Sequence, residues 1–265
     1  MYLADYHVHS ERSADANVPM AEMARRAVEA GLDELCFTDH VEPEAVFGAK
    51  ADWKALREAF ESAQSAVGGK IRLRLGMELG DAPWNFEEAD RLVREAPELD
   101  FIIGSIHCLT PEMGGANLYH YTPADEREGW LGLENYLSQV KRLADWGEFQ
   151  VLGHLTVPLR YYHRRGLTQF TFDPYEEEVR EILRTLIHQG CGIELNTNLG
   201  GAPIPGTKWL RVYRELGGEI ITLGSDTHEP DTLGKGIREG QELLRACGFE
   251  RFCTFERKQP VWQRL

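Results

Sequence analysis

The sequence predicts an α/β fold in which parallel strands and amphipathic helices alternate around a barrel. The chain has 265 residues, a length at which such a barrel commonly forms one domain. Seven short apolar runs of strand length alternate along it with helix patterns. The chain contains no low-complexity segment and no linker, so we expect a single domain over residues 1–265.

The first units of the chain illustrate the pattern. A short strand ends at His7-Val8-His9, and a helix starts near Asn17-Val18-Pro19, where Asn17 is a candidate N-cap. The next strand, 34–37, ends in Thr38-Asp39-His40. The alternation then continues, with helices expected over 52–67, 85–96 and 131–146 and strands over 71–77, 101–106 and 150–153.

The remaining segments complete the barrel. Residues 110–129 and 161–172 are predicted to be loops, and the first is long enough to form a lid or a rim. Asp173-Pro174-Tyr175-Glu176 has the N-cap, N1 proline and N3 glutamate of a helix start. Two more strands are expected at 192–195 and 219–223, with a short helix at 209–216 between them. A last helix is expected at 231–247, and a terminal strand with an arm at 252–265.

The charge of the chain excludes some functions. Lys and Arg number 29 against 43 Asp and Glu, which gives a formal net charge of −14. Sequence-independent nucleic-acid binding depends on a basic surface, so we expect no nucleic-acid partner and no docking on an anionic membrane. Bound cations would offset part of the acidic excess, although an acidic surface for solubility is a sufficient alternative.

The cysteines indicate a reducing compartment. The five cysteines show no C-x-x-C spacing and an odd count, which fits reduced thiols better than a disulfide framework. The N-terminus lacks the pattern of a signal peptide, and no apolar stretch is long enough to span a bilayer. We therefore expect a cytoplasmic protein; its oligomeric state is open.

Potential metal ligands follow the strands. In a β/α barrel the carboxyl ends of all strands meet on one face, where active sites lie. Six of the nine histidines follow predicted strands, and so converge there by topology. The polar groups at the seven strand ends are His7 and His9, Asp39 and His40, Glu78, His107, His154, Asn196, and Asp226 and His228.

Imidazoles and carboxylates without thiolates favour Zn, Mn or Fe, and a set this large exceeds the needs of one ion. We therefore predict two to three divalent metal ions. His7 and His9 lie two residues apart and so share a strand face, but this spacing alone would be weak evidence. His120 and His163 fall in rim loops, where they could contact substrate or have no functional role. His188 is interpreted as a solvated or helix-terminal residue.

The motifs at these strand ends occur in the order found in a known family. They are His7-Val8-His9, Thr38-Asp39-His40, Gly76-Met77-Glu78, Gly104-Ser105-Ile106-His107, Gly153-His154 and Ser225-Asp226-Thr227-His228. In these the chain resembles the PHP (polymerase and histidinol phosphatase) family, in particular its stand-alone histidinol-phosphatase type. The resemblance implies a distorted seven-stranded, TIM-like barrel with a trinuclear metal site.

The resemblance also implies ligand sets. His7, His9, Glu78 and Asp226 would bind the first ion, and Glu78, which bridges, would bind the second with His107 and His154. The third ion would take His40 and His228 together with Asp15, which stands where some relatives have a histidine. Thr156 is a second departure, because many relatives carry Asp there.

The implied activity is that of a metal-dependent phosphomonoesterase, with L-histidinol phosphate of histidine biosynthesis as the expected substrate. Paired metals would lower the pKa of a bridging water to about 7, and the resulting hydroxide would attack phosphorus. Glu78 would act as the bridging ligand, and Asp226 or His228 would protonate the leaving group. The alternatives are a phosphoesterase for another small phosphorylated metabolite or nucleotide, and a non-catalytic metal-binding regulatory module.

Three further residues are candidate substrate contacts. Arg160 lies six residues after His154 and is predicted to bind phosphate with two hydrogen bonds; a surface ion pair is the alternative. Asn196 and Asn198 follow the sixth predicted strand of this scheme and could contact substrate or orient metal ligands, and loop capping is equally compatible with their position.

Overall fold

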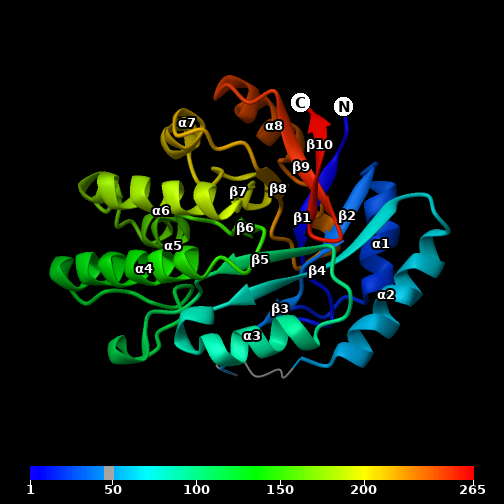
Figure 1. Cartoon of the computed structure of the whole chain (residues 1–265), viewed down its shortest axis with the longest axis horizontal. Helices are drawn as coiled ribbons and strands as arrows, with labels where there is room; N and C mark the ends of the chain where they lie inside the picture. Colours follow the sequence, from blue (N-terminus) through cyan, green and yellow to red (C-terminus); the bar gives the residue numbers. More distant parts are fainter. Residues whose placement is uncertain (45–50) are drawn as a thin grey trace.

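Seven parallel strands form a nearly closed barrel, as predicted (Figure 1). The computed structural model describes residues 1–44 and 51–265. In order around the barrel the strands are β1 (Ala4–Val8), β2 (Glu34–Phe37), β4 (Arg72–Gly80), β5 (Phe101–Ser105), β6 (Val151–Leu152), β7 (Gly192–Asn196) and β8 (Ile221–Gly224).

Contacts between the segment after β8 and the end of β1 close the ring. The backbone N–H of His9 donates to the carbonyl of Thr227 and that of Asp226 to the carbonyl of His7, both at 2.9 Å. The barrel is distorted beside β2, where a two-residue strand, β3 (His40–Val41), also pairs with β4. Because β1 and β8 meet here, ligands from the two ends of the chain become neighbours.

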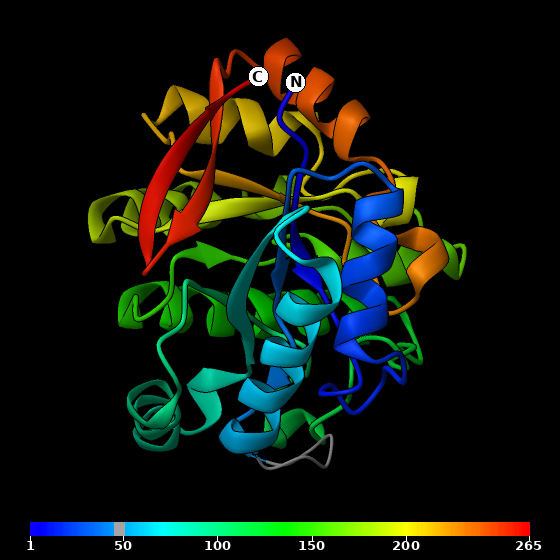
Figure 2. The ribbon, with the colours of Figure 1, turned by 90° about the vertical axis from the view of Figure 1, so that its right-hand side faces the viewer.

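Helices surround the strands (Figures 1 and 2). Asp52, Asn85 and Asp125 cap three of them by accepting a hydrogen bond from the backbone N–H three residues later. The helices are α1 (Met20–Glu29), α2 (Trp53–Val67), α3 (Phe86–Glu95), α4 (Glu126–Trp146), α5 (Val157–Arg164), α6 (Glu176–Gln189), α7 (Thr207–Glu215) and α8 (Ile237–Ala246).

Several predicted helix boundaries are wrong. The cap at Asp125 starts α4 inside the predicted loop 110–129, and α5, with Pro158 in its first turn, reaches into the predicted loop 161–172. The predicted start at Asp173 forms a 3-10 turn that precedes α6. Gly234 and Gly236 have positive φ angles of 70° and 77°, so α8 begins after them rather than at 231.

The start of α1 also differs from the prediction, because Pro19 rather than Asn17 occupies the N-cap position. Proline has no N–H and a fixed φ, which suits the beginning of a helix. At the other boundary α1 stops at Glu29, two residues before Gly31.

The tail forms a hairpin at the amino ends of the barrel strands. It consists of β9 (Arg251–Glu256) and β10 (Gln259–Arg264), an antiparallel pair where one strand and an arm were expected. Arg74 on β4 binds Glu256 at 2.9 Å, and the backbone N–H of Phe255 donates to the Tyr6 hydroxyl at 2.8 Å. The hairpin therefore lies at the end of the barrel opposite the predicted ligands.

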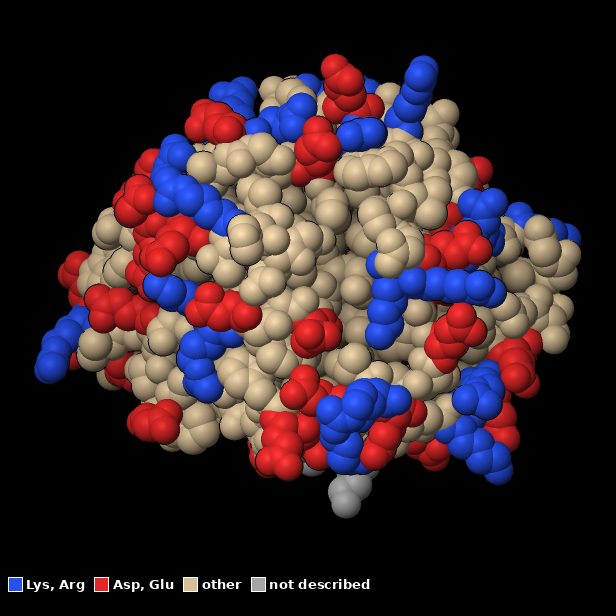
Figure 3. Space-filling model, viewed as in Figure 1, with Lys and Arg blue, Asp and Glu red and all other residues tan. Residues whose placement is uncertain are grey.

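All five cysteines are buried, and none is paired in a disulfide. Among the helices of the described residues, none is both long enough and apolar enough to cross a membrane. Acidic and basic side chains are interspersed on the face drawn in Figure 3 rather than gathered by sign.

Candidate metal centre

The carboxyl ends of the strands open into a cavity of about 650 Å³. His7 and His9 are fully buried beneath it. Its floor is formed by the predicted ligands Asp15, His40, Glu78, His107, His154, Asp226 and His228, and its rim includes Tyr119, His120, Arg160, Tyr161 and Arg164.

Glu78 on β4 lies at the centre of the predicted ligands. Its Oε2 lies 3.1 Å from His7 Nε2, 3.6 Å from His9 Nε2 and 3.0 Å from His40 Nδ1. Its Oε1 lies 3.1 Å from His107 Nε2 and 3.0 Å from His154 Nε2. Each carboxylate oxygen therefore faces its own group of imidazoles, an arrangement compatible with bridging two ions.

Asp226 joins the same group from the segment after β8. Its Oδ1 lies 3.6 Å from both His7 Nε2 and His9 Nε2. Asp226 and His154 have positive φ angles of 61° and 22°, a backbone conformation that residues other than glycine rarely adopt. Such backbone conformations gather at functional sites, where the surrounding contacts hold them.

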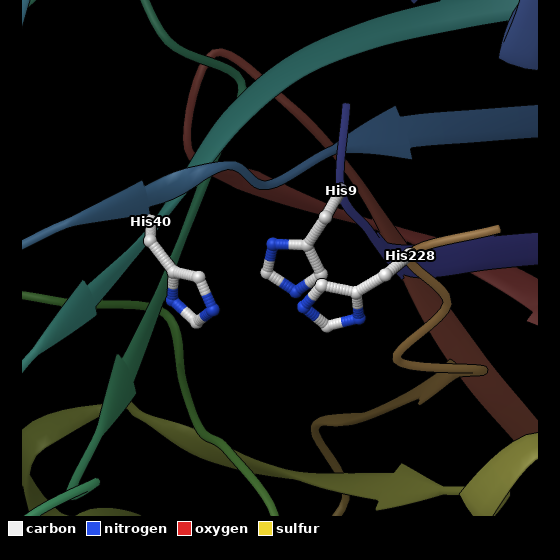
Figure 4. Close-up of side chains that lie close together, drawn as sticks. All are labelled: His9, His40 and His228. Carbon is white, nitrogen blue, oxygen red and sulfur yellow. The ribbon is translucent and has the colours of Figure 1, made fainter. Parts of the chain in front are cut away.

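A second group of imidazoles lies toward the solvent. His9, His40 and His228 come from three separate segments and lie side by side (Figure 4), with ring centroids 4.3 Å apart for His9 and His40 and 4.1 Å for His9 and His228. Asp15 Oδ2 lies 3.1 Å from His228 Nε2 and 3.5 Å from His40 Nε2. The structure thus brings Asp15 to the two histidines with which it was grouped, and places His9 beside both groups.

The polar atoms at the centre fit metal ions. Buried polar atoms are almost always hydrogen-bonded, and an exception needs an explanation. Here four of them lie together without a hydrogen-bond partner among the described residues: His7 Nε2, His9 Nε2, His40 Nδ1 and Glu78 Oε2. All four belong to ligand types that bind Zn or Mn, so cations would satisfy them together.

Among the described residues, four groups of three side chains have ligand atoms within 4.8 Å of one another. Three groups consist only of predicted ligands, and the fourth contains Glu42, which was not predicted. The groups are His7, His9 and Glu78; Glu78, His107 and His154; His9, His40 and His228; and His40, Glu42 and His107.

The surroundings of His7 and His9 shift the pKa values of these two imidazoles in opposite directions. Burial opposes the charged form of His7, but the carboxylates of Glu194, Glu78 and Asp226 outweigh it and raise its pKa well above the usual value. Burial and the neighbouring imidazoles of His228 and His40 lower the pKa of His9 well below the usual value. His9 is therefore neutral at pH 7 and presents a free lone pair.

Glu78 remains ionised. Burial opposes its charge, yet the imidazoles of His7, His107 and His40 keep its pKa well below the usual value. A charged carboxylate can use both of its oxygens as ligands, which bridging requires.

The predicted substrate contacts differ in their surroundings. Arg160 on α5 lines the cavity with a side chain only 9% exposed, and its Nη1 donates to Asp226 Oδ2 at 3.1 Å, so it forms an ion pair inside the cavity rather than with the acidic exterior. Its Nε is buried and has no hydrogen-bond partner among the described residues. Arg160 is thus a cation with a spare donor beside the predicted ligands.

Asn196 and Asn198 are not among the residues that line the cavity. Asn196 is buried and donates to Glu194 Oε2 at 3.3 Å, and its Oδ1 accepts from the backbone N–H of Asn198. Asn198 Oδ1 accepts from Arg164 at 3.0 Å. These bonds favour the orienting and capping roles over direct substrate contact.

The histidines predicted in rim loops differ in whether they line the cavity. His120 lines the cavity, whereas His163 donates from Nε2 to the carbonyl of Phe170 at 2.9 Å and does not line it. His188 lies in the last turn of α6, which confirms its helix-terminal position.

Sequence analysis did not single out Glu194, Asp5 or Asp81, and it grouped Asp39 with the potential metal ligands; the structure shows that all four acids hold the ligand segments. Glu194, Asp5, Asp39 and Asp81 are buried and accept hydrogen bonds from backbone N–H groups next to or within these segments. A signal existed, because a carboxylate inside a short apolar strand, such as Glu194 in Gly192–Asn196, must face the barrel interior or a partner.

The fold and site together define a class: β/α barrels whose strand ends present clustered imidazoles and carboxylates suited to several metal ions. Within this class the chain belongs to the PHP domain family, whose model matches residues 5–198.

Similar proteins carry more specific names. The histidinol-phosphatase of Lactococcus lactis subsp. lactis (strain IL1403) is 28% identical over 95% of this chain and 93% of its own. A crystal structure of histidinol phosphate phosphatase from the same organism, in complex with zinc, L-histidinol and phosphate, has a TM-score of 0.80 at 26% identity and covers 98% of both chains. A structure from Listeria monocytogenes, with 19% identity, a TM-score of 0.72 and coverage of 89% and 99%, shares the fold.

Proposed function

We propose that this protein is a metal-dependent phosphomonoesterase that hydrolyses L-histidinol phosphate. The observation that carries the proposal is a set of buried polar atoms around Glu78 that have no hydrogen-bond partner among the described residues. Glu78 lies at the floor of a cavity that Arg160 also lines. The names of the similar proteins and the zinc, L-histidinol and phosphate bound in one of them support this substrate.

The ligand sets proposed for the ions follow the distances. His7, His9, Glu78 and Asp226 would hold one ion, and Glu78, His107 and His154 a second. His40, His228 and Asp15 would hold a third, with His9 close enough to contribute. When bound, two to three ions of Zn, Mn or Fe would lower the pKa of a coordinated water and neutralise the phosphoryl oxygens.

The protein's own residues would bind the substrate and move a proton. Arg160 would donate to the phosphate from the nitrogens that Asp226 leaves free, and so hold the ester against the floor of the cavity. Tyr119, Tyr161 and Arg164 would surround the organic part at the rim.

Hydrolysis forms a bond from the water oxygen to phosphorus and breaks the bond from phosphorus to the ester oxygen. The leaving alkoxide needs a proton, which the attacking water can supply through Asp226 or His228, because both line the cavity and lie among the predicted ligands.

Metal analysis and phosphate release from a panel of phosphomonoesters test the proposal. We expect two to three ions per chain and the highest kcat/KM for L-histidinol phosphate. A hundredfold preference for another small phosphate or a nucleotide would reassign the substrate, and a metal-loaded protein inert on every ester would contradict phosphatase activity.

A further inference from the structure

Glu194 on β7 connects two proposed ligands that belong to different ions. Its side chain is only 1% exposed, and its Oε1 lies 2.6 Å from His7 Nδ1. Its Oε2 accepts from the backbone N–H of His154 at 2.8 Å and from Asn196 Nδ2 at 3.3 Å. One buried carboxylate therefore contacts the end of β1 and the segment after β6.

The contact with His7 determines which nitrogen is free. Glu194 Oε1 is a hydrogen-bond acceptor in this contact, so His7 Nδ1 carries the hydrogen. Nε2 is then the nitrogen that faces Glu78 Oε2 at 3.1 Å and Asp226 Oδ1 at 3.6 Å. Fixing the hydrogen on the outer nitrogen both orients a ligand imidazole and makes it a stronger base toward a metal.

The contact with His154 holds an unusual backbone. The φ angle of His154 is 22°, and the hydrogen bond to Glu194 fixes the N–H of this same residue. In this position His154 Nε2 lies 3.0 Å from Glu78 Oε1. Without the acceptor, the buried N–H of His154 would lose its partner, and the residue could relax away from Glu78.

The neighbouring strand leaves space for the carboxylate. A Cβ atom at Gly224, the last residue of β8, would lie 2.4 Å from Glu194 Oε1 and 2.4 Å from the Cβ of His7. Glycine at this position therefore allows the pair of Glu194 and His7 to pack against the end of β8.

We propose that Glu194 is a positioning residue that sets His7 for the first ion and His154 for the second. The inference rests on the proposed function, because it assigns Glu194 to the same metal centre. It makes the affinities for these two ions depend on one carboxylate that binds neither of them.

Substitution Glu194→Gln tests this. The amide keeps the size of the side chain but has one acceptor oxygen, which can serve His7 or His154 but not both. In protein stripped of metal and titrated with Zn²⁺ against a competing chelator, without substrate, we expect about 10- to 100-fold weaker binding of the two tightest ions. Glu219→Gln, which changes an exposed glutamate that pairs with Arg251, should bind like the wild type.

Two readouts separate positioning from a general loss of structure. The visible spectrum of the Co²⁺-loaded protein should change in Glu194→Gln and not in Glu219→Gln, because it reports ligand geometry. In the Zn²⁺ enzyme, kcat should fall while KM changes less than threefold. An unchanged spectrum, or a loss confined to KM, would overturn the inference.

Failure of the inference differs from failure of the proposed function. Wild-type protein that binds no Zn²⁺ would overturn both, whereas equal Zn²⁺ affinity of wild type and Glu194→Gln would overturn the role of Glu194 alone. If Glu194→Gln does not fold, Glu194→Asp replaces it, since a carboxylate shorter by one methylene cannot reach both partners. Weaker Zn²⁺ binding by that variant supports the inference, and wild-type affinity contradicts it.

Discussion

Glu78 places one carboxylate between two groups of imidazoles, so its substitution should affect both groups together. In Glu78→Gln we expect loss of at least one ion per chain and a loss of activity greater than the roughly 10- to 100-fold typical of residues that only orient ligands. Metal analysis and phosphate release measure these effects. Far-UV circular dichroism should remain that of the wild type, because the side chain keeps its volume.

The control for this variant is Glu95→Gln, an exposed glutamate on α3 that pairs with Arg91. It should keep the metal content and activity of the wild type. Activity of Glu78→Gln within a factor of ten of the wild type would show that Glu78 does not bridge the ions.

Arg160 can be tested by a substitution that keeps its charge. Lysine lacks the planar fork of arginine, so it cannot hold Asp226 and the phosphate at the same time. For Arg160→Lys we expect kcat/KM to fall about 10- to 100-fold, the equivalent of one charged hydrogen bond, and inhibition by inorganic phosphate to weaken in parallel.

The matched control is Arg180→Lys on α6, where the arginine pairs with Glu176 at the surface. Its steady-state kinetics should equal those of the wild type. If Arg160→Lys retained wild-type inhibition by phosphate, Arg160 would serve only to hold Asp226.

The sequence predicted that the imidazoles and carboxylates at the strand ends lie together, because a barrel brings these ends to one face whatever the conformation of the loops. It could not predict the partners of Glu194 or Asp39. A buried acid that binds a backbone N–H is recognised only when the neighbouring strand and its register are known. Arg160 was found from its spacing after His154, but its contact with Asp226 required the fold.

Four buried acids link neighbouring strands through hydrogen bonds to backbone N–H groups. Asp5 on β1 accepts from the N–H of Ser225 after β8 at 2.8 Å, and Asp39 after β2 accepts from the N–H of Ser10 after β1 at 2.6 Å. Asp81 after β4 accepts from the N–H of His107 after β5 at 2.8 Å, and Glu194 completes the set. The segments that carry the ligands are thereby fixed by protein contacts alone.

Close packing of β8 against β1 and β7 should make its last glycine indispensable. In Gly224→Ala the new methyl group would displace Glu194 and His7, since both lie 2.4 Å from its position. We expect the free energy of unfolding to fall by about 1–3 kcal/mol, as for other overpacked sites, and the Zn²⁺ affinity to fall with it. Urea denaturation and chelator competition measure the two effects.

Gly206→Ala is the comparison for this variant, because among the described residues no atom other than those of Gly206 and its two chain neighbours lies within 4 Å of a Cβ built at Gly206. Its Zn²⁺ affinity should not change. A Gly224→Ala protein with unaltered stability and Zn²⁺ affinity would mean that β8 can move away from β1 without consequence for the ligands.

Helix α5 is an element that the sequence analysis did not predict. Its eight residues, Val157–Arg164, contain two tyrosines, two arginines and a histidine, and the sequence analysis places its C-terminal half in the predicted loop 161–172. The helix forms because Pro158 favours its first turn and Val157 and Tyr162 are buried against the barrel. It is this helix that places Arg160 and Arg164 at the cavity.

Over the whole molecule, the two ends of the barrel serve different purposes. At the amino ends, Glu34 accepts from Tyr6 at 2.5 Å and from Arg74 at 3.0 Å, and Arg74 also binds Glu256 of the hairpin. Every charge in this network has a partner within the protein. At the carboxyl ends, by contrast, polar atoms of the predicted ligands His7, His9, His40 and Glu78 are buried without a hydrogen-bond partner among the described residues. Stability at this end should therefore depend on cations.

Removal of metal tests this difference between the two ends. Ions that bind only the folded state stabilise it by about 3 kcal/mol when present at 100 times their dissociation constant. For a chain of this size that corresponds to a fall in Tm of roughly 5–10 °C on chelation. Thermal denaturation of the protein as purified, after chelation and after reloading with Zn²⁺ measures the change, and reloading should restore the original Tm. Glu78→Gln, which lacks the carboxylate proposed to bridge the ions, should respond to the chelator much less than the wild type. Equal Tm values for the chelated and the reloaded wild-type protein would show that its buried imidazoles are stable without cations.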